Sequence, residues 1–139
     1  DSAFIESFAE IRNMCAPQVP GPVQHASAAA WGDEAHVEKA RAAYRANYVT
    51  ADELLTGRLG YQRPAGGFCL WLDVSQIGND KDATVTLWKD KGVKVIPGSF
   101  LAQAGRDGTN PGANYVRLAL VQDPGTIREA LERLIEVLA

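Results

Sequence analysis

The stretch Phe68-Cys-Leu-Trp-Leu-Asp-Val74 decides the fold, because its pattern predicts one extended strand with two different faces. Every second residue from Phe68 to Val74 is large and apolar, and the residues between them are Cys69, Trp71 and Asp73. The turn-forming segment Pro64-Ala-Gly-Gly67 leads into this strand. We therefore expect one face of the strand to lie against a core.

Two further strands are expected downstream. Val93-Lys-Val-Ile96 is a short candidate that Pro97-Gly98 would stop, and residues 115 to 122 form a longer one. A helix from Asp80 to Lys91, ended by Gly92, should separate the first two strands.

The last element is a helix that Asp123-Pro124 begins, with Asp as the cap and Pro in the first turn. Apolar residues from Ile127 to Leu138 form a stripe at helical spacing. The order strand, helix, strand, strand, helix predicts an α+β fold, a three-stranded sheet with helices packed on one face. We expect the first and the last strand to lie side by side.

The first part of the chain predicts helices. Phe4 to Cys15 has apolar residues at helical spacing, with Asp1 or Ser2 as a possible cap, and we expect Pro17 to end the helix. The stretch from Pro17 to Pro22 should be a loop.

A second helix is expected from Val23 to Trp31, and Asp33 should cap a long third helix over residues 34–55. Thr50 followed by Glu53 is a possible capping box, which would restart this helix near its weakest point. We expect two regions, a helical segment over residues 1–59 and a small domain over residues 60–139. The long helices have enough apolar positions to contact another domain.

Composition excludes several classes of function. The net charge of -3 gives no cationic surface for nucleic acid, and the longest apolar runs are far shorter than the roughly 20 residues that span a bilayer. Only two cysteines occur, in no metal-type spacing, which favours reduced thiols and a cytoplasmic location. The chain shows no secretory leader, and its start at Asp1 rather than Met predicts a fragment or a processed chain.

Most candidate catalytic residues have a simpler explanation. His25 and His36 have no partner at metal-binding spacing, so we expect no metal site. Lys89 follows Thr86 in a Thr-x-x-Lys pattern, but charged neighbours indicate a solvated helix face rather than a catalytic lysine. The sequence therefore predicts no catalytic residue within this chain.

Arg117 is different, because it lies in the apolar strand Tyr115-Val-Arg-Leu-Ala-Leu-Val121. An arginine in such a strand needs either water or an anion beside its guanidinium. The planar guanidinium suits a carboxylate from a side chain or a ligand. The alternative is an arginine that is exposed to solvent on the open face of the sheet and binds nothing.

Three motifs resemble, in order and spacing, the small domain of class I/II aminotransferases, which have the fold-type I architecture. They are Pro64-Ala-Gly-Gly-Phe-Cys-Leu-Trp-Leu-Asp73, Gly92-Val-Lys-Val-Ile-Pro-Gly-Ser-Phe100 and Tyr115-Val-Arg-Leu-Ala-Leu120. The segments Gln24 to Trp31 and Asp33 to Val37 look like the stretch that follows the cofactor lysine in this family. The Gly-Gly-Phe-x-Leu-Trp-Leu-Asp variant is most similar to succinyldiaminopimelate aminotransferases of lysine biosynthesis.

The resemblance implies an enzyme that uses pyridoxal 5'-phosphate to transfer an amino group between an amino acid and a 2-oxo acid. It gives Arg117 the role of binding the substrate α-carboxylate, and it implies a homodimer. The Schiff-base lysine of the family, in Ser-x-x-Lys, has no match, nor do the residues that bind the cofactor ring and phosphate. The resemblance places them in a large domain before Asp1, so we expect this chain alone to bind no cofactor and to be inactive.

Two other readings remain open at this stage. The chain could be a free-standing binding or dimerisation module that shares this domain. It could also be a small regulatory domain that binds amino acids, with Arg117 as the anchor for the carboxylate.

Overall fold

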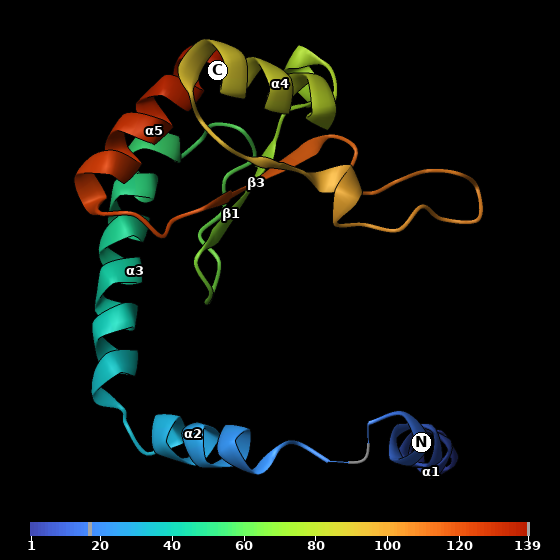
Figure 1. Cartoon of the computed structure of the whole chain (residues 1–139). Coiled ribbons are helices and arrows are strands. Elements are labelled where there is room, and N and C mark those ends of the chain that lie inside the picture. The colour runs from blue at the N-terminus through green and yellow to red at the C-terminus, as the bar shows by residue number, and fades with distance from the viewer. Residues whose placement is uncertain (17, 139) are drawn as a thin grey trace. The chain divides into compact units, whose positions relative to one another are not determined.

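The computed structural model describes residues 1–16 and 18–138, and they form two compact units that divide after Lys39 (Figure 1). The described elements are, in chain order, α1 (Ser2–Cys15), α2 (Gly21–Trp31), α3 (Ala35–Leu55), β1 (Cys69–Asp73), the short helix η1 (Ser75–Ile77), α4 (Asp80–Lys91), β2 (Ile96–Pro97), the short helix η2 (Gly98–Phe100), β3 (Tyr115–Ala119) and α5 (Pro124–Leu138). This is the expected α+β architecture. Within the described ranges every helix is too short or too polar to cross a bilayer.

The first unit contains α1 and α2. Asp1 caps α1, since its side chain accepts a hydrogen bond from the amide of Ala3 at 3.0 Å. Pro17, which was expected to end this helix, lies outside the described residues. Gly21 and Pro22 belong to α2 rather than to the loop that we predicted, because the fixed φ of proline is compatible with the first turn of a helix.

The helix α3 begins in the first unit and continues into the second. Asp33 caps it, as predicted, by accepting a hydrogen bond from the amide of Ala35 at 2.9 Å. The predicted interruption at Thr50 is wrong: α3 is continuous, and Thr50, Ala51 and Leu55 are buried in the second unit.

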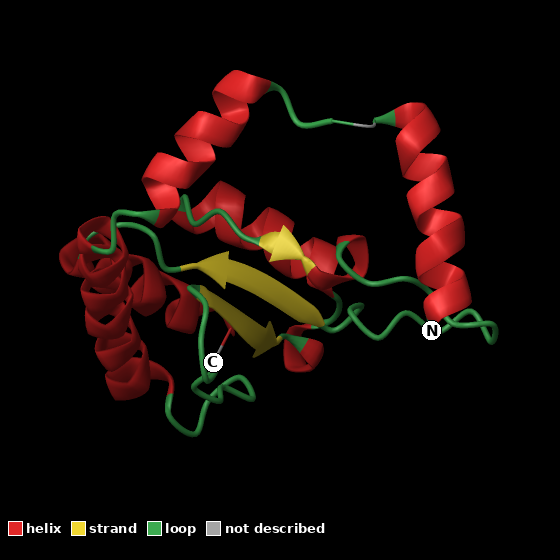
Figure 2. Ribbon diagram, turned by 90° about the horizontal axis from the view of Figure 1, so that it is seen from below, coloured by secondary structure: helices red, strands yellow, loops and turns green. Residues whose placement is uncertain are grey.

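The second unit is built around an antiparallel sheet with the strand order β1-β3-β2, so the first and last strands are neighbours as predicted (Figure 2). The sheet buries the apolar face of each long strand, which includes Leu70, Leu72, Val116 and Leu118. The helices α4 and α5 and the last turns of α3 complete the core through their own buried leucines, among them Leu55, Leu87 and Leu131.

The strands are shorter than the sequence predicts, for a reason that lies in their hydrogen bonds. Val93 was expected to begin the second strand, but its amide donates to the carbonyl of Leu87 and closes the end of α4. The left-handed Gly92, with φ of 66°, makes this cap possible. Phe68 was assigned to the apolar face, yet it remains 42% exposed and stacks on Tyr44 of α3.

Candidate functional site

Arg117 occupies the middle of the central strand of the sheet. Its Cα lies opposite Trp71 on β1 and opposite Ile96 on β2. Val116 and Leu118 on either side of it are buried, so the backbone that carries Arg117 is held by the core below and by a strand on each side. The side chain therefore projects from the other, accessible face of the sheet.

Arg117 is half-buried, and among residues 1–16 and 18–138 no group forms a hydrogen bond or ion pair with its guanidinium. A partly desolvated arginine is stabilised by an anion, and its planar set of donors matches a carboxylate. The surroundings of Arg117 are thus suited to the binding of an acidic group.

Aromatic rings lie next to Arg117. The rings of Trp71 and Tyr115 stack with their centroids 5.5 Å apart and their planes 16° apart. Both residues are on the accessible face, one directly opposite Arg117 and the other two positions before it on β3. They form an aromatic wall on one side of Arg117 that would shield part of a bound carboxylate from water.

The loop from Gly98 to Asn110 borders the same face of the sheet. A Cβ atom on Gly98 would lie 2.4 Å from the carbonyl oxygen of Gly112 and 3.0 Å from the ring of Trp71, so only glycine allows this approach. The buried carboxylate of Asp80 accepts a hydrogen bond from the amide of Ser99 at 2.8 Å. The side chain of Asn110 donates to the carbonyl of Ser99 at 3.0 Å and holds the other end of the loop.

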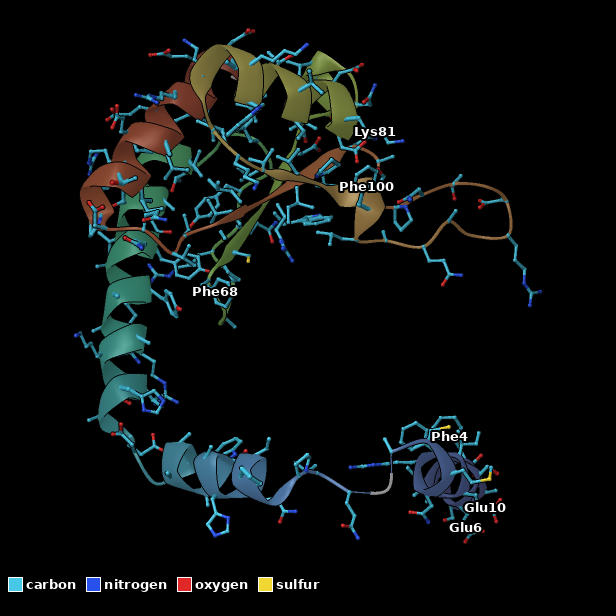
Figure 3. The ribbon with its side chains drawn as sticks, viewed as in Figure 1. Phe4, Glu6, Glu10, Phe68, Lys81 and Phe100 are labelled. Carbon is cyan, nitrogen blue, oxygen red and sulfur yellow. The ribbon has the colours of Figure 1, made fainter. Side chains whose placement is uncertain are left out.

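The beginning of the loop also contacts α4. The ammonium of Lys81 lies over the ring of Phe100, 5.7 Å from its centroid (Figure 3). Neither Asp80 nor Asn110 was singled out from the sequence, because their partners are distant along the chain. The Pro97-Gly98 turn was the only local signal for this arrangement.

A second group of basic residues lies beside the segment that leads into β1. Arg41, Arg45 and Arg63 line a pocket of about 440 Å³ with aromatic walls. This pocket was not predicted from the sequence. The spacing of Arg41 and Arg45, one turn apart on a helix, was a signal, but the position of Arg63 beside them was not predictable from spacing.

The histidines, the lysine and the cysteines for which no catalytic or metal-binding role was predicted have ordinary surroundings. His36 pairs with the capping carboxylate of Asp33 at 3.1 Å, and that hydrogen bond is the main reason why the pKa of Asp33 is lowered. Lys89 is exposed on α4, and both cysteines are free. Across the described ranges, no group of His, Cys, Asp and Glu side chains has an arrangement that could hold a metal ion.

Comparison with known proteins decides the family. The family described as aminotransferase class I and II matches residues 3–134. The chain belongs to this family.

Individual relatives agree with this assignment. The chain is 32% identical over 135 residues to the 4-dedimethylamino-4-oxo-anhydrotetracycline transaminase of Streptomyces rimosus, a match that covers 96% of this chain and 35% of the relative. It is 36% identical over 106 residues to the aspartate/prephenate aminotransferase of Thermus thermophilus, covering 75% of this chain and 25% of that enzyme. The chain thus spans between a quarter and about a third of the length of these curated relatives.

Solved structures show the same fold. An aminotransferase from Neisseria meningitidis is 34% identical and superposes with a TM-score of 0.80, covering 100% of this chain and 35% of that one. A Thermus thermophilus protein described as a probable N-succinyldiaminopimelate aminotransferase is 29% identical with a TM-score of 0.55, covering 69% of this chain and 24% of that one.

Aminotransferases of this family use pyridoxal 5'-phosphate, and the described residues do not fit that cofactor. A lysine that binds it must be neutral near pH 7, which requires a desolvated or electropositive pocket. Within the described ranges no lysine is buried, and the half-buried Lys91 is paired with Glu136 at 2.5 Å. The glycines of the Gly66-Gly67 pair precede a strand rather than the N-terminus of a helix, so they form no phosphate cradle.

Proposed function

We propose that this chain acts as the small domain of a pyridoxal-phosphate-dependent aminotransferase, which transfers an amino group between an amino acid and a 2-oxo acid. Membership of the family supports the type of reaction, and the coverage of the relatives supports a further large domain in the working enzyme. The cofactor, when bound, supplies the electron sink for the reaction. The residues of this chain contribute substrate binding.

One observation carries the proposal: Arg117 is half-buried, and its guanidinium has no hydrogen-bond or ion-pair partner within the described part of the chain. Arg117 binds the α-carboxylate of the substrate, because two parallel N–H donors match the two carboxylate oxygens. Trp71 and Tyr115 exclude water from this pair, which strengthens it. The orientation of the substrate follows, since one fixed carboxylate determines where the amino group can lie.

The chain by itself binds no pyridoxal phosphate and is inactive. The exposure of its lysines and the lack of a phosphate cradle within the described ranges support this part of the proposal. The Schiff-base lysine and the remaining cofactor contacts belong to the large domain. The working enzyme is a cytoplasmic homodimer, a state that would also cover apolar surface on the helices.

The substrate is N-succinyldiaminopimelate, and the reaction belongs to lysine biosynthesis. The similarity to the Thermus thermophilus protein and the motif Gly66-Gly-Phe-Cys-Leu-Trp-Leu-Asp73 support this choice. Other relatives have different printed substrates, among them the aspartate/prephenate enzyme.

The test is amino transfer by the full-length protein with pyridoxal phosphate and a panel of amino donors, 2-oxoglutarate serving as the acceptor. We expect activity that Arg117→Ala strongly reduces while the cofactor absorbance of the protein stays unchanged. No transfer with any donor would refute the proposed reaction. Tight amino-acid binding by the 139-residue chain without cofactor would instead identify an amino-acid-binding module.

A further inference from the structure

The loop between β2 and β3 is closed at its base, where its first and last residues contact each other. The base consists of residues 98–100 and residues 110–113, and we call these two stretches the loop base. A Cβ atom on Gly112 would lie 2.2 Å from the carbonyl oxygen of Gly98, so the two backbones touch directly. Figure 1 shows the rest of the loop in orange, extending away from the sheet.

Asn110 ties the loop base together from within. Its side-chain amide donates to the carbonyl of Ser99 at 3.0 Å and to the carbonyl of Ala102 at 3.3 Å. Its side-chain oxygen accepts a hydrogen bond from the amide of Gly112 at 2.9 Å. One side chain therefore bonds to both stretches of the base.

Asp80, in the first turn of α4, ties the same two stretches from outside. Its carboxylate accepts a hydrogen bond from the amide of Ser99 at 2.8 Å, and its own amide donates to the carbonyl of Ala113 at 3.0 Å. Asp80 is only 2% exposed. A buried carboxylate requires hydrogen-bond donors, so moving Ser99 away from it is costly. The loop base is thus attached to the core through α4.

The loop base supports the indole ring of Trp71. A Cβ atom on Gly98 would lie 3.0 Å from the edge of this ring, and the face of the ring stacks on Tyr115. Trp71 lies opposite Arg117 in the register of the sheet, and side chains at opposite positions of an antiparallel pair are neighbours. The ring is therefore held on two sides, next to the arginine.

We propose that Asn110 and Asp80 are positioning residues for the carboxylate site at Arg117, an inference that rests on the proposed function. They act through the loop base and Trp71 rather than by contact with the substrate. A fixed indole restricts the conformations of the neighbouring arginine. An arginine that is already restricted loses less conformational freedom when it binds a carboxylate, so the affinity is higher.

The link between Asn110 and the indole is tested in the 139-residue chain by NMR. The α protons of Gly98 lie beside the ring of Trp71, whose ring current displaces their signals from the position usual for a loop glycine. Asn110→Ala should move these signals toward their position in Trp71→Leu, which has no indole. Identical Gly98 signals in the parent and in Asn110→Ala would overturn the link.

The effect on the substrate is measured in the full-length enzyme with its most active amino donor. Asn110→Ala should raise KM about tenfold, the effect of losing one or two hydrogen bonds. It should change kcat by less than about twofold, the pattern expected when binding common to the ground state and the transition state is lost. Asp80→Ala should act in the same way. Asp80→Asn keeps a carbonyl acceptor for Ser99 and should restore KM to within about twofold of the parent.

Asp107→Ala is the matched control in the same loop. The carboxylate of Asp107 accepts hydrogen bonds from the amide and the hydroxyl of Thr109, at 3.1 Å and 2.7 Å, and both bonds lie outside the loop base. This variant should keep the KM of the parent. A rise in KM as large as that of Asn110→Ala would overturn the role of the loop base.

A double-mutant cycle separates positioning from general destabilisation. In the background of Trp71→Leu, Asn110→Ala should change KM by less than about twofold, because the loop base then has no indole to hold. Multiplicative effects of the two substitutions on KM would show that Asn110 acts independently of Trp71 and would overturn the proposal.

Arg117→Ala reports separately on the proposed function. If Arg117→Ala impairs the enzyme and Asn110→Ala leaves KM unchanged, only the positioning role is overturned. If the enzyme with Arg117→Ala keeps its activity, the proposed function of Arg117 fails and the carboxylate site fails with it. The Gly98 signals of Asn110→Ala would still move in that case, because they depend on the loop base alone.

Discussion

The side-chain amide of Asn47 on α3 donates a hydrogen bond to the carbonyl oxygen of Leu120 at 2.9 Å. The same amide also donates to the carbonyl of Gln122 at 2.9 Å. These carbonyls follow the last residue of β3, where a strand partner would otherwise be needed, and Asn47 is only 2% exposed. One side chain thus ends the strand and attaches the sheet to the long helix.

Replacing Asn47 should therefore destabilise the second unit. Asn47→Leu leaves the buried carbonyl of Leu120 without a donor, and we expect a loss of about 1 to 3 kcal/mol in the free energy of unfolding. Urea denaturation would measure it. Asn114→Leu is the matched control, because Asn114 is exposed and should change stability by less than about 0.5 kcal/mol. Equal stability of the two variants would contradict this role for Asn47.

The loop beside Arg117 provides a second prediction. Asp80→Ala removes the acceptor for the amide of Ser99, so that amide should exchange with solvent faster by at least tenfold, whereas the amides between β1 and β3 keep their protection. Asp80→Asn retains a carbonyl acceptor and should show a smaller change. Asp90→Ala changes an exposed carboxylate of the same helix and serves as the control. Uniform loss of protection across the sheet would indicate a global rather than a local role.

The sequence was sufficient for the elements whose determinants are local. The apolar stripe of α5, the proline in its first turn and the left-handed Gly92 after α4 all act within a few residues, and each was found as predicted. The strand that contains Arg117 was also found. Its alternation puts Arg117 on one face of the sheet and the buried Val116 and Leu118 on the other.

Features that depend on distant partners were not predictable. The end of β3 depends on Asn47, which is 73 residues away from Leu120. The start of β2 depends on whether the amide of Val93 pairs with a strand or with the carbonyl of Leu87. The arginine pocket requires α3 and residues 63–68 to meet, and no periodicity in either segment specifies that contact.

The carboxylate of Asp52 should make stability depend on pH in the acid range. A hydrogen bond from the hydroxyl of Tyr61, at 2.6 Å, is the main cause that lowers the pKa of Asp52 below 3.8, and the ion pair with Arg63 adds to it. A carboxyl group whose pKa is lower in the folded state than in the unfolded state stabilises the folded state at pH values above its unfolded-state pKa. That contribution is then lost as the pH falls below 3.8 through the folded pKa.

Asp52→Asn tests this dependence, because it keeps an acceptor for Tyr61 but removes the titrating group. We expect the thermal midpoint of the parent to fall more steeply than that of the variant when the pH is lowered from 5 to about 2. Parallel curves for the two proteins would show that Asp52 has no part in the acid sensitivity.

The exposed apolar face of α1 should promote self-association. Phe4, Ile5, Phe8, Ile11 and Met14 are between 55% and 81% exposed, and Figure 3 shows Phe4 on one side of the helix and Glu6 and Glu10 on the other. Large bare apolar patches are rare on soluble monomers. Sedimentation of the chain should reveal a dimer or larger species that Ile5→Lys with Phe8→Lys disrupts.

Glu10→Lys is the control for that change of charge, since Glu10 lies on the polar side of α1. It should leave the association unchanged. A monodisperse monomer of the unaltered chain, without binding of a hydrophobic dye, would contradict the prediction.

Arg117 provides the last prediction, in the full-length enzyme. If its guanidinium holds the substrate α-carboxylate with two parallel hydrogen bonds, Arg117→Lys should impair the enzyme nearly as much as Arg117→Ala, because an ammonium provides a point charge without that geometry. Truncating one partner of a shielded, hydrogen-bonded ion pair costs about 2 to 5 kcal/mol, which corresponds to roughly 30-fold to several-thousand-fold in kcat/KM. Folding should persist, since Val116 and Leu118 still fill the core. Retention of kcat/KM within about threefold in Arg117→Ala, or a loss that unfolding explains, would assign Arg117 a structural role instead.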